Sequence, residues 1–137
     1  MNLAITKSEV EQILAEHAFT HYYGFVIHEL AEGVCTVKVP FDEKFIRPGG
    51  LISGPTLMAA ADVAMWFAIM TILGRTDMAV TVELNTAFLS GAKREDVYCR
   101  AEVLKLGRRL VYGTAECTNA AGKRLTHHTL TYIRPDA

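Results

Sequence analysis

Residues 55–73 form the longest apolar run of the chain, and this run limits the folds that the sequence can adopt. The run, PTLMAAADVAMWFAIMTIL, approaches the length of a membrane span, but it contains many alanines and one carboxylate, Asp62. A helix that is apolar all round is also typical of a core helix wrapped by a sheet. Because the rest of the chain has no second such run and reads as long amphipathic strands, we expect a core helix and no contact with a membrane.

The segments on both sides of the run show strand and helix patterns. Residues 7–17 have apolar residues at helical spacing, and Thr6 with Glu9 forms a possible capping box. A hairpin is predicted at 24–31 and 34–40, before an irregular loop over 41–54 that contains three glycines. Strand patterns follow the long helix, and strands joined by short turns are expected to be antiparallel neighbours. These later strands are predicted at 78–89, 96–106, 109–118 and 124–133.

This order of elements predicts one α+β domain over residues 1–137. A single antiparallel sheet of six strands would wrap around the long central helix, and a short N-terminal helix would be added outside it. The length suits one domain, and half of the residues are hydrophobic, which is ample for a core.

Composition also limits the function. The net charge of −1 leaves no basic field for nucleic acid. The N-terminus does not read as a secretory signal, and the spacing of Cys35, Cys99 and Cys117 suits neither a disulfide framework nor a zinc site. His127 and His128 are strand neighbours that point to opposite faces, so they do not share one metal. We expect a cytoplasmic protein with three buried thiols, no metal site and no cofactor.

The pattern resembles the hot-dog fold and, within it, the acyl-CoA thioesterases related to the phenylacetate-pathway enzyme. Relatives read G-x-x-H-G-G at the start of the long helix, with an acid seven residues later. Here Gly50-Leu-Ile-Ser-Gly-Pro55 runs to Asp62, Val80-Thr-Val-Glu-Leu-Asn85 follows, and Leu104-Lys-Leu-Gly-Arg-Arg comes later. The spacing matches over residues 20–134, but three letters of the motif differ. Ser53 replaces the usual histidine, Pro55 the second glycine, and Arg47 a frequent asparagine.

The resemblance implies hydrolysis of a thioester. Asp62 would be the general base that activates water, because a carboxylate shielded by apolar walls is a better base at neutral pH. The backbone N–H of Gly54, at the helix N-terminus, would stabilise the oxyanion. Thr81 matches the position of a hydroxyl that helps to hold the water; an ordinary strand threonine is the alternative.

Gly54 and Asp62 are eight residues apart on one helix, about 12 Å at 1.5 Å per residue. They therefore cannot act on one carbonyl within a single chain. The family solves this with a homodimer in which the two helices run antiparallel, and we expect the same here. Two such dimers can pair further into a tetramer, which the sequence does not decide.

Other residues are candidates for substrate binding. Arg47 could contact the thioester or a coenzyme A phosphate, and Ser53 could contact the substrate or cap the helix. Lys105 and Arg108 lie at a turn where the resemblance implies contact with the nucleotide. The large side chains on the long helix could line an acyl tunnel or pack in the core. These four are Met58, Met65, Trp66 and Met70.

Two other functions fit the same fold. A hot-dog acyl-CoA hydratase or dehydratase would pair a histidine with an acid, but no histidine occurs between His28 and His127. A non-catalytic acyl-CoA-binding module would have no need of Asp62. The acyl group, and whether its carrier is coenzyme A or an acyl carrier protein, cannot be read from the sequence.

Overall fold

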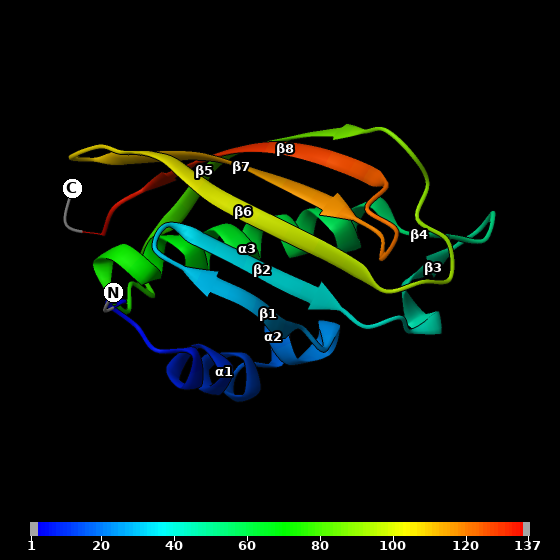
Figure 1. Ribbon diagram of the computed structural model, residues 1–137, viewed down its shortest axis with the longest axis horizontal. Helices are drawn as coiled ribbons and strands as arrows, with labels where there is room; N and C mark the ends of the chain where they lie inside the picture. Colours follow the sequence, from blue (N-terminus) through cyan, green and yellow to red (C-terminus); the bar gives the residue numbers. More distant parts are fainter. Residues whose placement is uncertain (1–2, 136–137) are drawn as a thin grey trace.

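The computed structural model describes residues 3–135 and contains the predicted sheet and central helix (Figure 1). One antiparallel sheet of six strands, in the order β1-β2-β6-β7-β8-β5, curves around helix α3 (Gly54–Leu73). Its strands are β1 (Val26–Ala31), β2 (Val34–Val39), β5 (Val80–Phe88), β6 (Val97–Leu106), β7 (Leu110–Thr118) and β8 (Arg124–Ile133). The α+β prediction is therefore confirmed.

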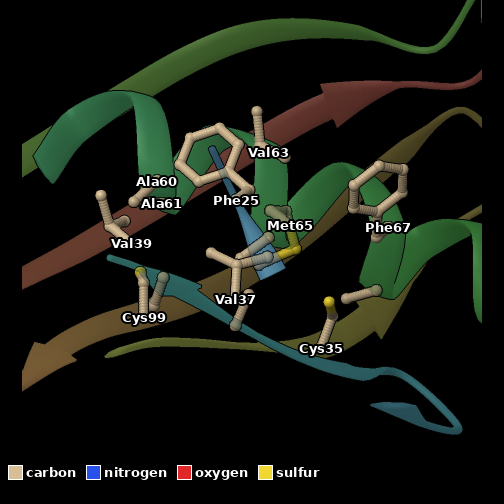
Figure 2. Close-up of a cluster of buried hydrophobic side chains, with 14 of the residues drawn as sticks. Phe25, Cys35, Val37, Val39, Ala60, Ala61, Val63, Met65, Phe67 and Cys99 are labelled. Carbon is tan, nitrogen blue, oxygen red and sulfur yellow. The ribbon is translucent and has the colours of Figure 1, made fainter. Parts of the chain in front are cut away.

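Helix α3 is the core of the molecule. Figure 2 shows Val63, Met65 and Phe67 of this helix among side chains of the sheet, and these three residues are at most 3% exposed. By length and composition alone α3 could cross a membrane, but most of it is buried against the sheet. Pro55 lies in its first turn, and Gly74 ends it with φ +83° and an N–H donated to the Met70 carbonyl. The expected core helix is confirmed.

Two helices pack outside the sheet, although only one was predicted. Helix α1 (Lys7–Glu16) has the predicted capping box of Thr6 and Glu9. Helix α2 (Ala18–Tyr23) follows directly and is too short for an apolar periodicity to indicate it. The Thr20 hydroxyl donates to the Leu14 carbonyl at 2.9 Å and fixes α2 against α1.

The predicted irregular loop over 41–54 contains regular structure. A 3₁₀ turn, η1 (Glu43–Phe45), is followed by a small hairpin of β3 (Ile46–Arg47) and β4 (Leu51–Ile52). Gly49 and Gly50 have φ of +102° and +81°, a conformation that lets so tight a turn close.

The expected pairing of the first two strands after the helix is wrong. Strand β5 pairs with β8 at the sheet edge, while β6 lies between β2 and β7. The connection from Leu89 to Asp96 is longer than a hairpin turn, so it can cross from one side of the sheet to the other. It passes β4, where the Ile52 N–H donates to the Ala92 carbonyl at 2.9 Å.

The two histidines lie on opposite faces of β8 and the three cysteines are buried, as the sequence predicted. His128 is fully buried between Thr86 and Thr126, while His127 lies on the other face beside Glu116. All three cysteines are free and buried. Within residues 3–135, no cluster of three potential metal ligands occurs.

Candidate active site

Asp62 is the only charged residue of α3, and the sheet holds it from two strands. Its Oδ1 accepts the Thr81 hydroxyl of β5 at 2.7 Å and the Tyr132 hydroxyl of β8 at 2.6 Å. Among the described residues, no hydrogen bond uses Oδ2. The carboxylate is half-buried and faces a cavity of about 170 Å³, whose other walls include Phe19 and Trp66. One carboxylate oxygen is thus fixed, and the cavity that Asp62 lines has room for a water molecule.

Tyr132 was not identified from the sequence. Its hydroxyl also donates to the backbone carbonyl of Asp62 at 2.8 Å, so one phenol contacts both the main chain and the side chain of that residue. Alternation along β8 places Tyr132 on the inward face with His128 and Leu130, and a buried tyrosine hydroxyl needs a partner. That signal was present, but the partner depends on the pairing of β5 with β8, which local pattern does not reveal.

Burial and the adjacent Asp62 carboxylate raise the pKa of Tyr132 well above its ordinary value. The phenol therefore keeps its proton at neutral pH and acts as a donor. Thr81 also uses its one proton on the carboxylate, so only its oxygen lone pairs remain available to a water.

Gly54 lies in a different cavity, at the N-terminus of α3. This cavity is about 320 Å³ and is lined mainly by apolar residues of β4, α3, the end of β5 and the segment after it, with Arg47 at its wall. The first N–H groups of a helix have no partner within it, so the Gly54 N–H is an orphan donor by position. A Cβ at Gly54 would lie 3.0 Å from the ring of Phe88, so only glycine fits here without displacing the ring.

Ser53 does not cap α3 with its side chain, contrary to the expectation. It occupies the N-cap position, but its hydroxyl pairs with the hydroxyl of Thr56 at 2.7 Å. The physical reason is the second helical residue, Pro55, which has no N–H to donate. The Thr56 N–H is already used by the Ser53 carbonyl at 3.1 Å. Ser53 is also not among the residues that line the Gly54 cavity.

The predicted cationic residues lie at opposite ends of the molecule. Arg47 is exposed and lines the Gly54 cavity. Lys105 and Arg108 are exposed at the turn between β6 and β7, and Figure 1 shows this turn at the far end from β3 and β4. Within one chain, therefore, the structure does not bring Lys105 or Arg108 to Arg47.

The large side chains of α3 divide between the two roles that the sequence left open. Met65 and Met70 are at most 1% exposed and pack in the core, whereas Trp66 lines the Asp62 cavity. The Trp66 indole donates to the Thr76 carbonyl at 3.1 Å, which fixes the ring. Trp66 and Phe19 also line a second, mostly apolar cavity of about 280 Å³ that adjoins the first.

The chain matches known proteins over most of its length. Residues 49–126 match the family model of the thioesterase superfamily. A Saccharolobus solfataricus protein named "Putative esterase SSO1253" is 31% identical over 107 residues, which are 78% of this chain and 71% of that protein.

Solved structures described as thioesterases are also similar to this chain. A Silicibacter sp. TM1040 structure described as a "putative thioesterase" is 33% identical, with a TM-score of 0.86 over 98% of this chain and 95% of that one. Zebra fish thioesterase superfamily member 2 is 26% identical, with a TM-score of 0.85 over 95% and 99%. With its six-stranded sheet wrapped around a central helix, the chain has the hot-dog fold and belongs to the thioesterase superfamily, a class of hydrolases acting on thioester bonds.

Proposed function

We propose that the protein is a cytoplasmic acyl-CoA thioesterase whose active site is shared across a homodimer. One observation carries this proposal: Asp62, the lone charge on an apolar helix, is held by one oxygen in a cavity while its other oxygen has no partner among residues 3–135. A charge on a core helix is costly unless it is paired or used. Thr81 and Tyr132 bind one oxygen of the carboxylate, and the proposed reaction would use the other oxygen.

The proposed reaction needs no cofactor. Asp62 Oδ2 takes a proton from a water as the water oxygen attacks the thioester carbonyl carbon. The carbonyl oxygen becomes anionic and accepts a hydrogen bond from the Gly54 N–H, where the α3 dipole favours negative charge. The tetrahedral intermediate then collapses, the carbon–sulfur bond breaks, and the proton held by Asp62 passes to the leaving thiolate. The products are a carboxylic acid and free coenzyme A.

The separation of the two groups supports a site made by two chains. Gly54 and Asp62 lie about 12 Å apart along α3, and the two cavities share no lining residue. Neither cavity alone contains both the oxyanion donor and the base. A second copy must supply the missing half.

Strand β5 offers the surface for that second copy. It is an edge strand of nine residues in which most large apolar side chains are exposed, with Val82 and Phe88 each at 58%. An exposed apolar edge strand is a template for pairing with another chain. The end of β5 at Thr81 contacts Asp62, and the end at Phe88 lies over Gly54.

The register of that pairing follows from a twofold axis. If two β5 strands pair antiparallel around a twofold axis at Asn85, the two Asn85 residues face each other and Thr81 of one copy lies beside Phe88 of the other. The Asp62 cavity of one chain then meets the Gly54 cavity of its partner. The same symmetry operation creates two equal composite sites.

The same axis rationalises the scattered cations. It places the β6–β7 turn of one copy, with Lys105 and Arg108, toward the end of the other copy that carries Arg47. Together they form the proposed contact region for the coenzyme A phosphates.

Leu110 and Tyr112 are exposed on the outer face of the sheet and offer a surface for a dimer of dimers.

The test is a panel of acyl-CoA thioesters with a free-thiol readout, comparing the wild type with Asp62→Asn. We expect thiol release from the wild type and a loss of about 10³-fold in kcat in the variant, with substrate binding retained by calorimetry. The protein's own thiols are shielded from the thiol reagent, because all three cysteines are buried.

Other outcomes would overturn the proposal. Thiol release unchanged by Asp62→Asn removes Asp62 as the base. Addition of water to an enoyl-CoA without thiol release would favour a hydratase. Tight binding of acyl-CoA with no turnover of any substrate would favour a binding module.

A further inference from the structure

The carboxylate of Asp62 is held asymmetrically. Both donors, Thr81 and Tyr132, bond to Oδ1, at 2.7 and 2.6 Å, and neither bonds to Oδ2. Tyr132 also bonds to the Asp62 carbonyl at 2.8 Å, so its single proton is shared between the side chain and the main chain of one residue. This three-centre contact restricts the rotation of the carboxylate relative to the helix backbone.

The sheet is built to deliver this contact. Thr81 and Tyr132 are direct cross-strand partners in the β5–β8 ladder, so their side chains lie on the same face. The ladder is irregular between Thr81 and Glu83, immediately after this pair. Such bulges bend an edge strand and re-aim a side chain, and they are common beside active sites. Tyr132 itself is 3% exposed and is therefore fixed by packing.

We propose that Tyr132 is a positioning residue that assigns the two oxygens of Asp62 to different tasks. Oδ1 is the anchored oxygen and Oδ2 is the oxygen that takes the proton from water. This inference rests on the proposed hydrolysis, because it specifies how Asp62 performs it. The hydroxyl of Tyr132 does not touch the substrate; it acts by keeping Oδ2 aimed into the cavity.

Few other charges act on this carboxylate. Of the residues lining its cavity, Tyr132 is the only other titratable group, and Phe19, Val63, Trp66, Ala79 and Thr81 complete the lining. The adjoining cavity contributes His17 and Asp77, and Asp77 is paired with Arg75 at 2.9 Å. A change in the pH dependence on removing the Tyr132 hydroxyl therefore reports on its bond to Asp62.

The experiment compares Tyr132→Phe with Tyr98→Phe, which removes a hydroxyl on β6 away from the site. Rates are measured for the most active acyl-CoA of the panel across pH. We expect the plateau kcat of Tyr132→Phe to fall about 10- to 100-fold, because a misaimed base loses reaction geometry, while KM stays within a factor of about two. The acid limb of the rate profile should also move to higher pH, because the variant lacks a hydrogen bond that favours a charged carboxylate.

A second pair of variants guards against a folding defect. Thr81→Val removes the other donor and should shift the acid limb in the same direction, whereas Thr81→Ser keeps the hydroxyl and should retain more activity than Thr81→Val. Melting temperatures from circular dichroism identify any variant that is unfolded at the assay temperature.

Each result decides the question. A plateau kcat for Tyr132→Phe equal to that of Tyr98→Phe overturns the positioning role, whether or not the acid limb of the pH profile moves. A plateau loss without a shifted limb assigns Tyr132 to structure alone and also overturns it. If Asp62→Asn abolishes thiol release in either case, the proposed function stands while this inference fails; if it does not, the proposed function itself is wrong.

Discussion

The two cavities along α3 are made in different ways. At Gly54 the proposed oxyanion donor is a backbone N–H, fixed by the start of a helix that lies close to the ring of Phe88. At Asp62 the useful group is a side chain, and two other side chains from the sheet hold it. A backbone donor does not depend on the identity of the side chains around it. A carboxylate held in one orientation depends on specific hydroxyl groups.

This difference explains where the sequence departs from the family motif. Arg47, Ser53 and Pro55 all lie before α3 or in its first turn, where the proposed oxyanion donor belongs to the main chain. Pro55 lacks an N–H, yet the donor of interest belongs to the residue before it. The acid keeps the spacing of the motif, and so does Thr81, as expected if the proposed second half-site depends on those side chains. This sequence thus departs from the motif at the half-site that is proposed to act through its backbone.

The largest effect on thiol release should come from combining two inactive variants, each lacking a different half-site, in one dimer. Asp62→Asn removes the base, and Gly54→Pro removes the oxyanion donor, so each variant alone should be inactive. Co-expressed with different affinity tags and purified through both, the heterodimer contains one intact composite site. It should show about half of the wild-type thiol release, because the twofold creates two equal sites.

The two homodimers are the matched controls, purified through the same two columns. Circular dichroism verifies that each variant is folded. An inactive heterodimer made of folded chains would place the base and the oxyanion donor within one chain and would contradict the composite site.

The next largest effect concerns the edge that joins the half-sites. Asn85→Asp adds a negative charge close to the proposed twofold axis, on a strand that already carries exposed Glu83. Like charges facing each other should raise the dimer dissociation constant about 10- to 100-fold. Sedimentation measures that constant, and activity per chain should fall with dilution in parallel.

Asn119→Asp is the control for charge alone. It makes the same substitution at the turn before β8, where the Asn119 side chain only accepts backbone N–H groups. Equal dissociation constants for the two variants would show that β5 is not the dimer edge.

A smaller effect should test the backbone half-site. Gly54→Ala keeps the N–H but places a Cβ 3.0 Å from the Phe88 ring, which must then move. Because the ring is exposed and can shift, we expect a loss of about 10-fold in kcat rather than an inactive protein. Gly54→Ala combined with Phe88→Leu should recover part of the rate. If the single variant has wild-type activity, the ring does not shape access to this donor.

The sequence predicted most of the helices and strands, but it did not predict which strands lie next to one another in the sheet. The long apolar run predicted α3, and strand patterns between turn residues predicted all six sheet strands, because these signals are local to each segment. The position of β5 beside β8 depends on a long crossover, and no local pattern encodes it. Tyr132 was missed for this reason: its role exists only once β8 lies next to Thr81. The hairpin of β3 and β4 was missed because strands of two residues show no alternation.

The smallest effect concerns the carrier of the acyl group, and it bears on the backbone half-site again. Arg47 is exposed beside the Gly54 cavity, so its proposed partner is a phosphate of coenzyme A rather than the reacting carbonyl. Arg47→Ala should raise KM for an acyl-CoA about five-fold and leave kcat unchanged, because a solvated cation contributes binding that is uniform along the reaction. With an acyl-pantetheine, which carries no phosphate, KM should not change. Arg94→Ala is the control, since Arg94 is engaged by Glu43 at 2.6 Å and does not line the cavity. An equal rise in KM for both substrates would place Arg47 on the acyl or thioester portion and would leave the phosphates to Lys105 and Arg108 of a second chain.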